Sequence, residues 1–151
     1  IEKADHFCIP YYSGIRWCTK YNIEYESQRN AKSIKGDVNF KLRRNQLEVY
    51  PDILKHIQAN HTYTLELATG FGKTVVAVKL AKDLGYKALV LFPGKLEEQW
   101  LNFINQNTTI QAAVVNSKGK NYSKCDILLS TVTMLKYLDA ETLAGIGTIF
   151  Y

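Results

Sequence analysis

The sequence predicts an α/β fold built around a parallel β-sheet, and three observations support this. A β-favouring run at residues 62–67 leads into the turn Gly-Phe-Gly-Lys-Thr at 70–74, and an apolar helical stretch follows at 75–84. The continuously apolar run at 88–92 is typical of a parallel strand covered on both faces. Strand and helix signals then alternate along the chain, the order expected of parallel strands joined by helices.

The remaining elements follow in chain order. A helix is expected over 43–58, ahead of the strand at 62–67, and the helix after the turn ends at a glycine stop signal, Gly85. Apolar side chains then recur at helical spacing, which predicts an amphipathic helix through Leu96, Trp100, Phe103 and Ile104. Further strands are expected at 110–115, 127–131 and 146–151, with a short helical stripe formed by Met134, Leu135 and Leu138.

Residues 70–74 have the composition of a phosphate-binding loop. Gly70 and Gly72 allow a tight turn whose N–H groups point at phosphate oxygens, and the following helix adds its positive N-terminal dipole. Lys73 would place a charge on the β- and γ-phosphates of a nucleoside triphosphate, and the Thr74 hydroxyl would hold Mg²⁺. The alternative is a glycine-rich turn with a solvated lysine, which the flanking strand and helix disfavour.

The loop departs from the general GxxxxGKS/T pattern, because Leu67 stands at the first glycine position and Ala68-Thr69 precede Gly70. This form resembles motif I of superfamily 2 helicases and translocases. The resemblance is to the group that contains DNA-repair helicases, restriction-enzyme motor subunits and viral transcript-release helicases. That group often has proline where this chain has Ala68.

Three further stretches resemble the same family, in the same order. The stretch 42–46, Leu-Arg-Arg-Asn-Gln, is similar to the element that reads adenine, and its Gln46 amide can pair with the base edge. The run 89–94, followed by Gln99-Trp100, is similar to motif Ia, although Gly94 replaces the usual threonine and puts one backbone contact in doubt. The stretch 126–131 resembles the strand whose terminal threonine contacts a nucleic-acid phosphate.

The resemblance implies an incomplete RecA-like P-loop NTPase domain over 40–151, the ATP-binding portion of an ATP-dependent DNA or RNA helicase or translocase. Lys73 and Thr74 would be catalytic, with Thr74 on Mg²⁺, and Pro93, Gly94 and Thr131 would contact nucleic-acid backbone. The other implied partner is a second RecA-like domain. The expected nucleotide-binding residues are Arg43, Gln46, Thr69, Gly70, Phe71, Gly72, Lys73 and Thr74.

In the resembled family the last strand leads into an Asp-Glu-x-His box, which these 151 residues do not contain. The fragment is therefore expected to bind ATP but to hydrolyse it poorly, because phosphoryl transfer depends on those carboxylates and on an arginine finger. Two alternatives stay open: a P-loop phosphotransferase, and an inert nucleotide- or nucleic-acid-binding module. The Leu42–Gln46 element and the Pro-Gly turn after residue 92 argue against the phosphotransferase.

Residues 1–39 are expected to form a small accessory segment rich in aromatic residues, among them Phe7, Trp17 and Tyr25. Aromatic side chains in short strands are more often core than base-stacking platforms, so packing is favoured. The net charge of +5 is compatible with phosphate-backbone binding. An odd count of three cysteines predicts free thiols and an intracellular location, and no apolar run reaches the ~18 residues of a membrane span.

Overall fold

A four-stranded parallel sheet forms the centre of the molecule in the computed structural model, which describes residues 2–3, 6–7, 16, 18–23, 31–118 and 121–151. The strands are β3 (Ala88–Leu91), β4 (Ala112–Val114), β5 (Ile127–Ser130) and β6 (Thr148–Phe150), in the order β4-β5-β3-β6. All three neighbouring pairs are parallel. The predicted α/β fold with a parallel sheet is confirmed, consistent with a RecA-like domain.

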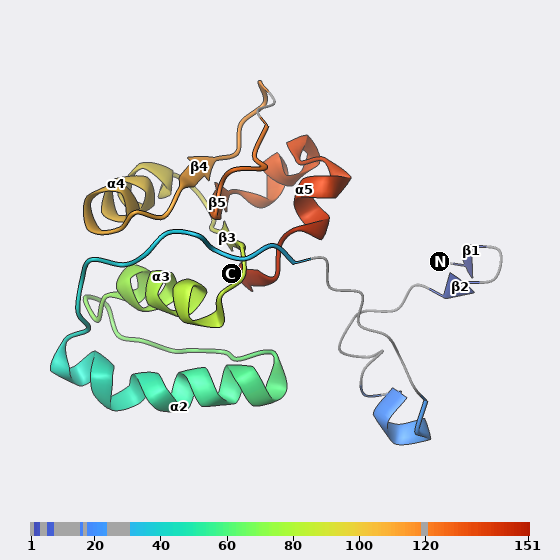
Figure 1. Cartoon of the computed structure of the whole chain (residues 1–151), viewed down its shortest axis with the longest axis horizontal. Helices are drawn as coiled ribbons and strands as arrows, with labels where there is room; N and C mark the ends of the chain where they lie inside the picture. Colours follow the sequence, from blue (N-terminus) through green and yellow to red (C-terminus); the bar gives the residue numbers. More distant parts are fainter. Residues whose placement is uncertain (1, 4–5, 8–15, 17, 24–30, 119–120) are drawn as a thin grey trace.

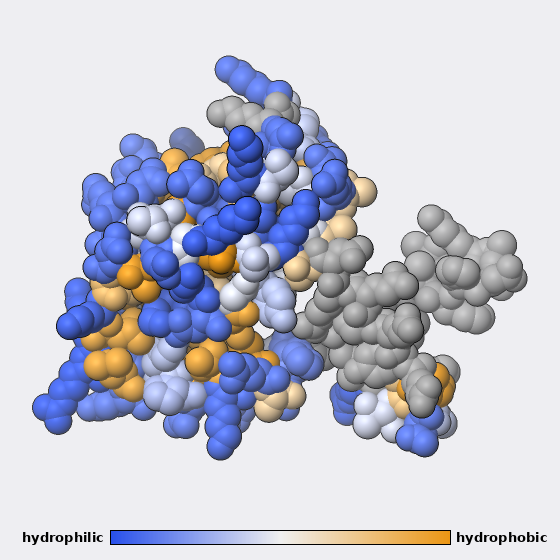
Figure 2. Space-filling model, in the orientation of Figure 1, coloured by the Kyte–Doolittle hydropathy of each residue, from blue (hydrophilic) through white to orange (hydrophobic). Residues whose placement is uncertain are grey.

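Helices cover the sheet in layers (Figure 1). Helix α3 (Lys73–Leu84) lies between the sheet and α2 (Arg44–Asn60), and α4 (Glu97–Asn107) packs against β4 and β5. Beyond β5 come a 3₁₀ helix, η1 (Val132–Tyr137), and the short α5 (Ala140–Ala144). Figure 2 shows hydrophilic side chains over most of the visible surface, with hydrophobic ones mainly where α2 and α3 lie.

Both faces of the sheet are buried, as the apolar composition of its strands predicts. On β3, Val90 belongs to a core cluster with Val78 of α3 and Ile104 of α4. Its neighbour Leu89 belongs to a second cluster on the opposite face, where Leu138 and the partly buried Met134 pack. The predicted stripe of Met134, Leu135 and Leu138 is therefore core contact, in a 3₁₀ turn.

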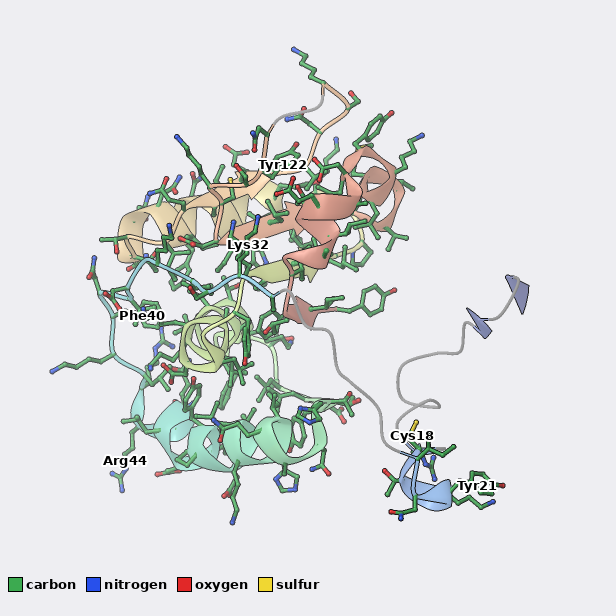
Figure 3. The ribbon with its side chains drawn as sticks, turned by 45° about the vertical axis from the view of Figure 1, so that its right-hand side comes forward. Cys18, Tyr21, Lys32, Phe40, Arg44 and Tyr122 are labelled. Atoms are coloured by element: carbon green, nitrogen blue, oxygen red, sulfur yellow. The ribbon has the colours of Figure 1, made fainter. Side chains whose placement is uncertain are left out.

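The segment 31–39 packs against the domain. Ile34 is buried in the core, its N–H donates to Gly85 O at 3.0 Å, and the Lys87 N–H donates to Lys32 O at 2.7 Å. Gly36 lies so close to the backbone of Ile110 that a Cβ added to Gly36 would meet the Ile110 Cα at 2.4 Å. Figure 3 shows this segment, with Lys32 and Phe40 labelled, running alongside the sheet and helices. The end of the predicted accessory segment 1–39 therefore packs against the sheet domain, and the boundary at residue 40 stays a prediction.

One strand prediction is wrong. Residues 62–67 form no strand in the structure, and β6 is bonded to β3 alone among the described strands. Leu65 still packs with the cluster around Ile53 and Val76 of α2 and α3. Leu65 is therefore partly buried by side-chain contacts with these helices, although residues 62–67 form no strand.

Two other features lie beyond the predicted elements. About half of the N-terminal segment 1–39, including Trp17 and Tyr25, lies outside the described residues. Within the described part, β1 (Glu2–Lys3) pairs antiparallel with β2 (His6–Phe7). Helix α5 was not expected, and Asp139 caps it by accepting a 2.6 Å hydrogen bond from the Thr142 N–H, which lowers the pKa of that carboxyl. No helix in the described part of the chain is both long and apolar enough to cross a membrane.

Asp126 connects the segment 31–39 to the sheet through hydrogen bonds, and these bonds should contribute to stability. Its side chain is 3% exposed, and its two carboxylate oxygens accept from Lys35 N and Gln111 N, each at 3.1 Å. Asp126→Asn leaves one of these N–H groups facing an amide donor, so we expect a loss of about 1–3 kcal/mol in the free energy of unfolding. Urea titration against the exposed control Asp52→Asn measures it, and equal stabilities would contradict the assigned role.

Candidate nucleotide-binding site

The loop ahead of α3 has the backbone that phosphate binding requires. Gly70 has φ of +80° and Gly72 has φ of +94°, values that side chains rarely permit. The Phe71 N–H donates to Ala68 O at 3.2 Å, and the Val76 N–H donates to Gly72 O at 3.1 Å as the helix begins. The turn predicted from the two glycines is present, and it leads directly into the first residue of α3.

The start of α3 carries positive potential without a local carboxylate to offset it. Its first turn contains Lys73 and Thr74 and no acidic residue. Lys73 is exposed, so its ammonium group is accessible, and Thr74 is half-buried. The unsatisfied N–H groups and the helix dipole attract anions to such a terminus. An added Cβ at Gly70 would meet nothing within 4 Å, so that side of the loop is open.

A cavity of about 780 Å³ adjoins the loop. The loop side of its lining comprises Thr69, Gly70, Gly72, Lys73 and Thr74. Residues at the end of β3 and the start of α4 also line it, namely Phe92, Leu96, Gln99 and Trp100, and further lining comes from α2, from residues 63–67 and from the β6 end of the chain. Its volume lies within the range of small-molecule sites, so a nucleotide is of suitable size.

Gln46 lies behind the loop. Its side chain is 1% exposed; Oε1 accepts from Arg43 N at 2.8 Å and Nε2 donates to Phe71 O at 2.7 Å. Arg43 is exposed just before α2, and Phe71 packs partly buried in the cluster under the loop. Recognition of adenine by Gln46 and Arg43 stays a prediction.

The three residues expected to contact nucleic acid lie on one edge of the sheet. Pro93 and Gly94 follow β3, Thr131 follows β5, and these strands are parallel neighbours in which Leu91 pairs with Ser130. Pro93 and Gly94 are exposed, and Gly94 has φ of +89°. Thr131 is half-buried, with its Oγ1 at 2.9 Å from Thr133 Oγ1.

Two residues that line the cavity were not among the predicted nucleotide-binding residues. Gln99 and Trp100 of α4 line the same cavity as the loop, and Trp100 stacks on Phe92 with ring centroids 6.4 Å apart. Helical spacing marks Trp100 as a core residue, which is correct only in part because its other surface lines the cavity. Their position shortly after the strand that resembles motif Ia was the sequence signal that could have marked Gln99 and Trp100 as residues near the site.

Residues 39–145 match the family described as "Type III restriction enzyme, res subunit". That range is well over half of the 151 residues. The chain belongs to this family. The family is superfamily 2 helicase-like, so the resemblance found in the sequence motifs is confirmed.

A curated viral protein is also similar to this chain. "Putative helicase 161L" of Invertebrate iridescent virus 6 is 26% identical over an alignment of 137 residues that covers 85% of this chain. The same alignment covers 31% of the viral protein, so the chain spans about a third of the length of this relative. The family and the relative together support a helicase-type, ATP-dependent function.

Proposed function

We propose that this chain binds ATP with Mg²⁺ at the loop 69–74 and serves an ATP-dependent motor that acts on DNA or RNA. The observation that carries the proposal is the loop: two glycines at positive φ lead into Lys73 and Thr74 at the open N-terminus of α3. The adjoining cavity has room for the rest of the nucleotide. Membership of the helicase-like family supports the same function.

The loop residues would share the work of holding the triphosphate. Backbone N–H groups of the loop and of the first turn of α3 would donate to phosphate oxygens, with the helix dipole adding to the attraction. The exposed Lys73 ammonium would lie on the β- and γ-phosphates, and the Thr74 hydroxyl would be a ligand of Mg²⁺. Bound Mg²⁺ would supply charge neutralisation at the phosphates. The absence of an acidic residue in the first turn suits these anionic groups.

Binding, rather than rapid hydrolysis, is the property we propose for these 151 residues. Hydrolysis requires a group that positions the attacking water, and the sequence contains no Asp-Glu-x-His box.

The Mg²⁺ assignment is tested at Thr74. Thr74→Ala removes the proposed ligand oxygen, so we expect the affinity for ATP in the presence of Mg²⁺ to fall by about tenfold, with little change in EDTA. Thr74→Ser keeps the hydroxyl and is the matched variant, expected to bind like the original chain. Calorimetric titration with and without Mg²⁺ measures both. An equal loss in EDTA and Mg²⁺ would contradict a metal-ligand role.

The nucleic-acid surface is tested at Thr131. Contacts at Pro93, Gly94 and Thr131 would be to the phosphate backbone, so binding should be sequence-tolerant and should weaken as salt rises. Thr131→Ala is expected to reduce affinity several-fold for unrelated single strands alike, whereas the exposed control Thr64→Ala should not. Fluorescence anisotropy over a salt series measures this. Salt-independent binding, or loss confined to one sequence, would count against backbone recognition.

A further inference from the structure

One buried amide joins the beginning of α2 to the phosphate loop. The Gln46 side chain is 1% exposed and makes two hydrogen bonds, accepting from Arg43 N and donating to Phe71 O at 2.7 Å. It also lies against the next loop residue, because a Cβ added to Gly72 would come within 2.6 Å of Gln46 Nε2. Gln46 therefore contacts two successive residues of the loop from behind.

The bond to Phe71 O constrains more than that oxygen. The carbonyl of Phe71 and the N–H of Gly72 belong to one planar trans peptide unit, so they point in nearly opposite directions. Holding the carbonyl towards Gln46 consequently directs the Gly72 N–H away from Gln46. That N–H is one of the donors that the turn offers to a bound anion. The Gln46 amide thus sets the direction of a proposed phosphate donor.

We propose that Gln46 is a positioning residue for the phosphate loop, which acts on phosphate binding whether or not a base is attached to the phosphates. The inference rests on the proposed function, because it assumes that the loop holds phosphates. A positioning role for Gln46 and a role in reading the base predict different results for a ligand that has phosphates but no base. A group that only reads the base would have no effect on inorganic tripolyphosphate, whereas a positioning residue affects tripolyphosphate, ATP and GTP alike.

Two substitutions separate the loop contact from the helix contact. Gln46→Glu keeps an oxygen that can accept from Arg43 N, but its carboxylate cannot donate to Phe71 O. Gln46→Met has a similar length and makes neither bond. The matched controls are Gln58→Glu and Gln58→Met, at an exposed glutamine near the other end of α2. Thermal unfolding of each variant checks that the chain remains folded.

The experiment titrates each variant with Mg²⁺ and ATP, GTP or inorganic tripolyphosphate. We expect both Gln46 variants to lose affinity for all three ligands by a similar factor, on the order of tenfold, with both Gln58 controls unchanged. Loss for ATP with unchanged tripolyphosphate binding would overturn the inference and leave Gln46 as a base-reading residue. Full binding by Gln46→Glu would overturn it too, because that variant lacks the bond to Phe71 O.

Amide hydrogen exchange keeps this test separate from the test of the proposed function. If the unsubstituted chain bound none of the three ligands, the proposed function would fail. The contact would still be tested by the exchange rates of the loop amides 70–72 without ligand. Faster exchange in both Gln46 variants than in the Gln58 controls supports the positioning role, and identical rates overturn it.

Discussion

Lys73→Ala is expected to lower the affinity for ATP and for ADP by ten- to a hundredfold. The substitution removes a charge-assisted bond to phosphate, and such bonds contribute about 1.5–3 kcal/mol each. The fold should persist because Lys73 is exposed at the first turn of α3 and its neighbours Val76 and Leu80 supply the buried contacts. Equilibrium titration of the folded variant measures the change.

The control for this prediction is Lys55→Ala, which removes one exposed lysine from α2, the helix that packs against α3. It changes the net charge by the same amount as Lys73→Ala. A general effect of charge would weaken nucleotide binding similarly in both variants. Superimposable titration curves for Lys73→Ala and the unsubstituted chain would refute the phosphate-loop assignment.

Gly72→Ala is expected to reduce nucleotide affinity at least tenfold, and by more than Gly70→Ala. Both glycines have positive φ, so each alanine adds backbone strain on the order of 1–3 kcal/mol. At Gly70 an added Cβ meets nothing within 4 Å, but at Gly72 it meets Gln46 Nε2 at 2.6 Å. Since Gln46 is buried and bonded at both ends of its amide, it cannot move aside without breaking those bonds.

The comparison of the two glycine variants isolates this contact. Titration with ATP and urea unfolding of both variants give the loss of binding and the loss of stability side by side. Equal losses at the two positions would mean that only φ matters and that the approach of Gln46 to the loop has no energetic weight.

The motif-bearing part of the fold was predictable because its signals are local. Gly72, Lys73 and Gly85 mark the beginning and end of α3, and the apolar run at 88–92 marks β3. The 62–67 run alternates like a strand, but strand formation also needs a backbone partner. In the structure Leu65 of this run packs on α2 and α3 instead, a tertiary outcome that the local pattern does not contain.

Long-range contacts account for what the sequence did not reveal. The sequence assigned residues 1–39 to an accessory segment, yet Ile34 is buried in the core, and Asp126 accepts a hydrogen bond from Lys35 N, ninety-one residues away. In the site, Gln46 and the loop were each predicted, but the bond from Nε2 to Phe71 O was not. A motif names residue types, whereas the partner of a buried amide depends on how α2 packs against the loop.

Amide NMR shifts of the 151-residue chain show whether the loop ahead of α3 holds the triphosphate. Adding ATP with Mg²⁺ should shift the backbone N–H signals of residues 70–74 most strongly, in a saturable way, while adenosine should leave them nearly unchanged. A second cavity at the amino ends of the strands, lined by Lys32, Lys87 and Asp126 among others, provides the internal comparison. Saturable shifts confined to that cavity, or none at residues 70–74, would show that the triphosphate does not bind at this loop.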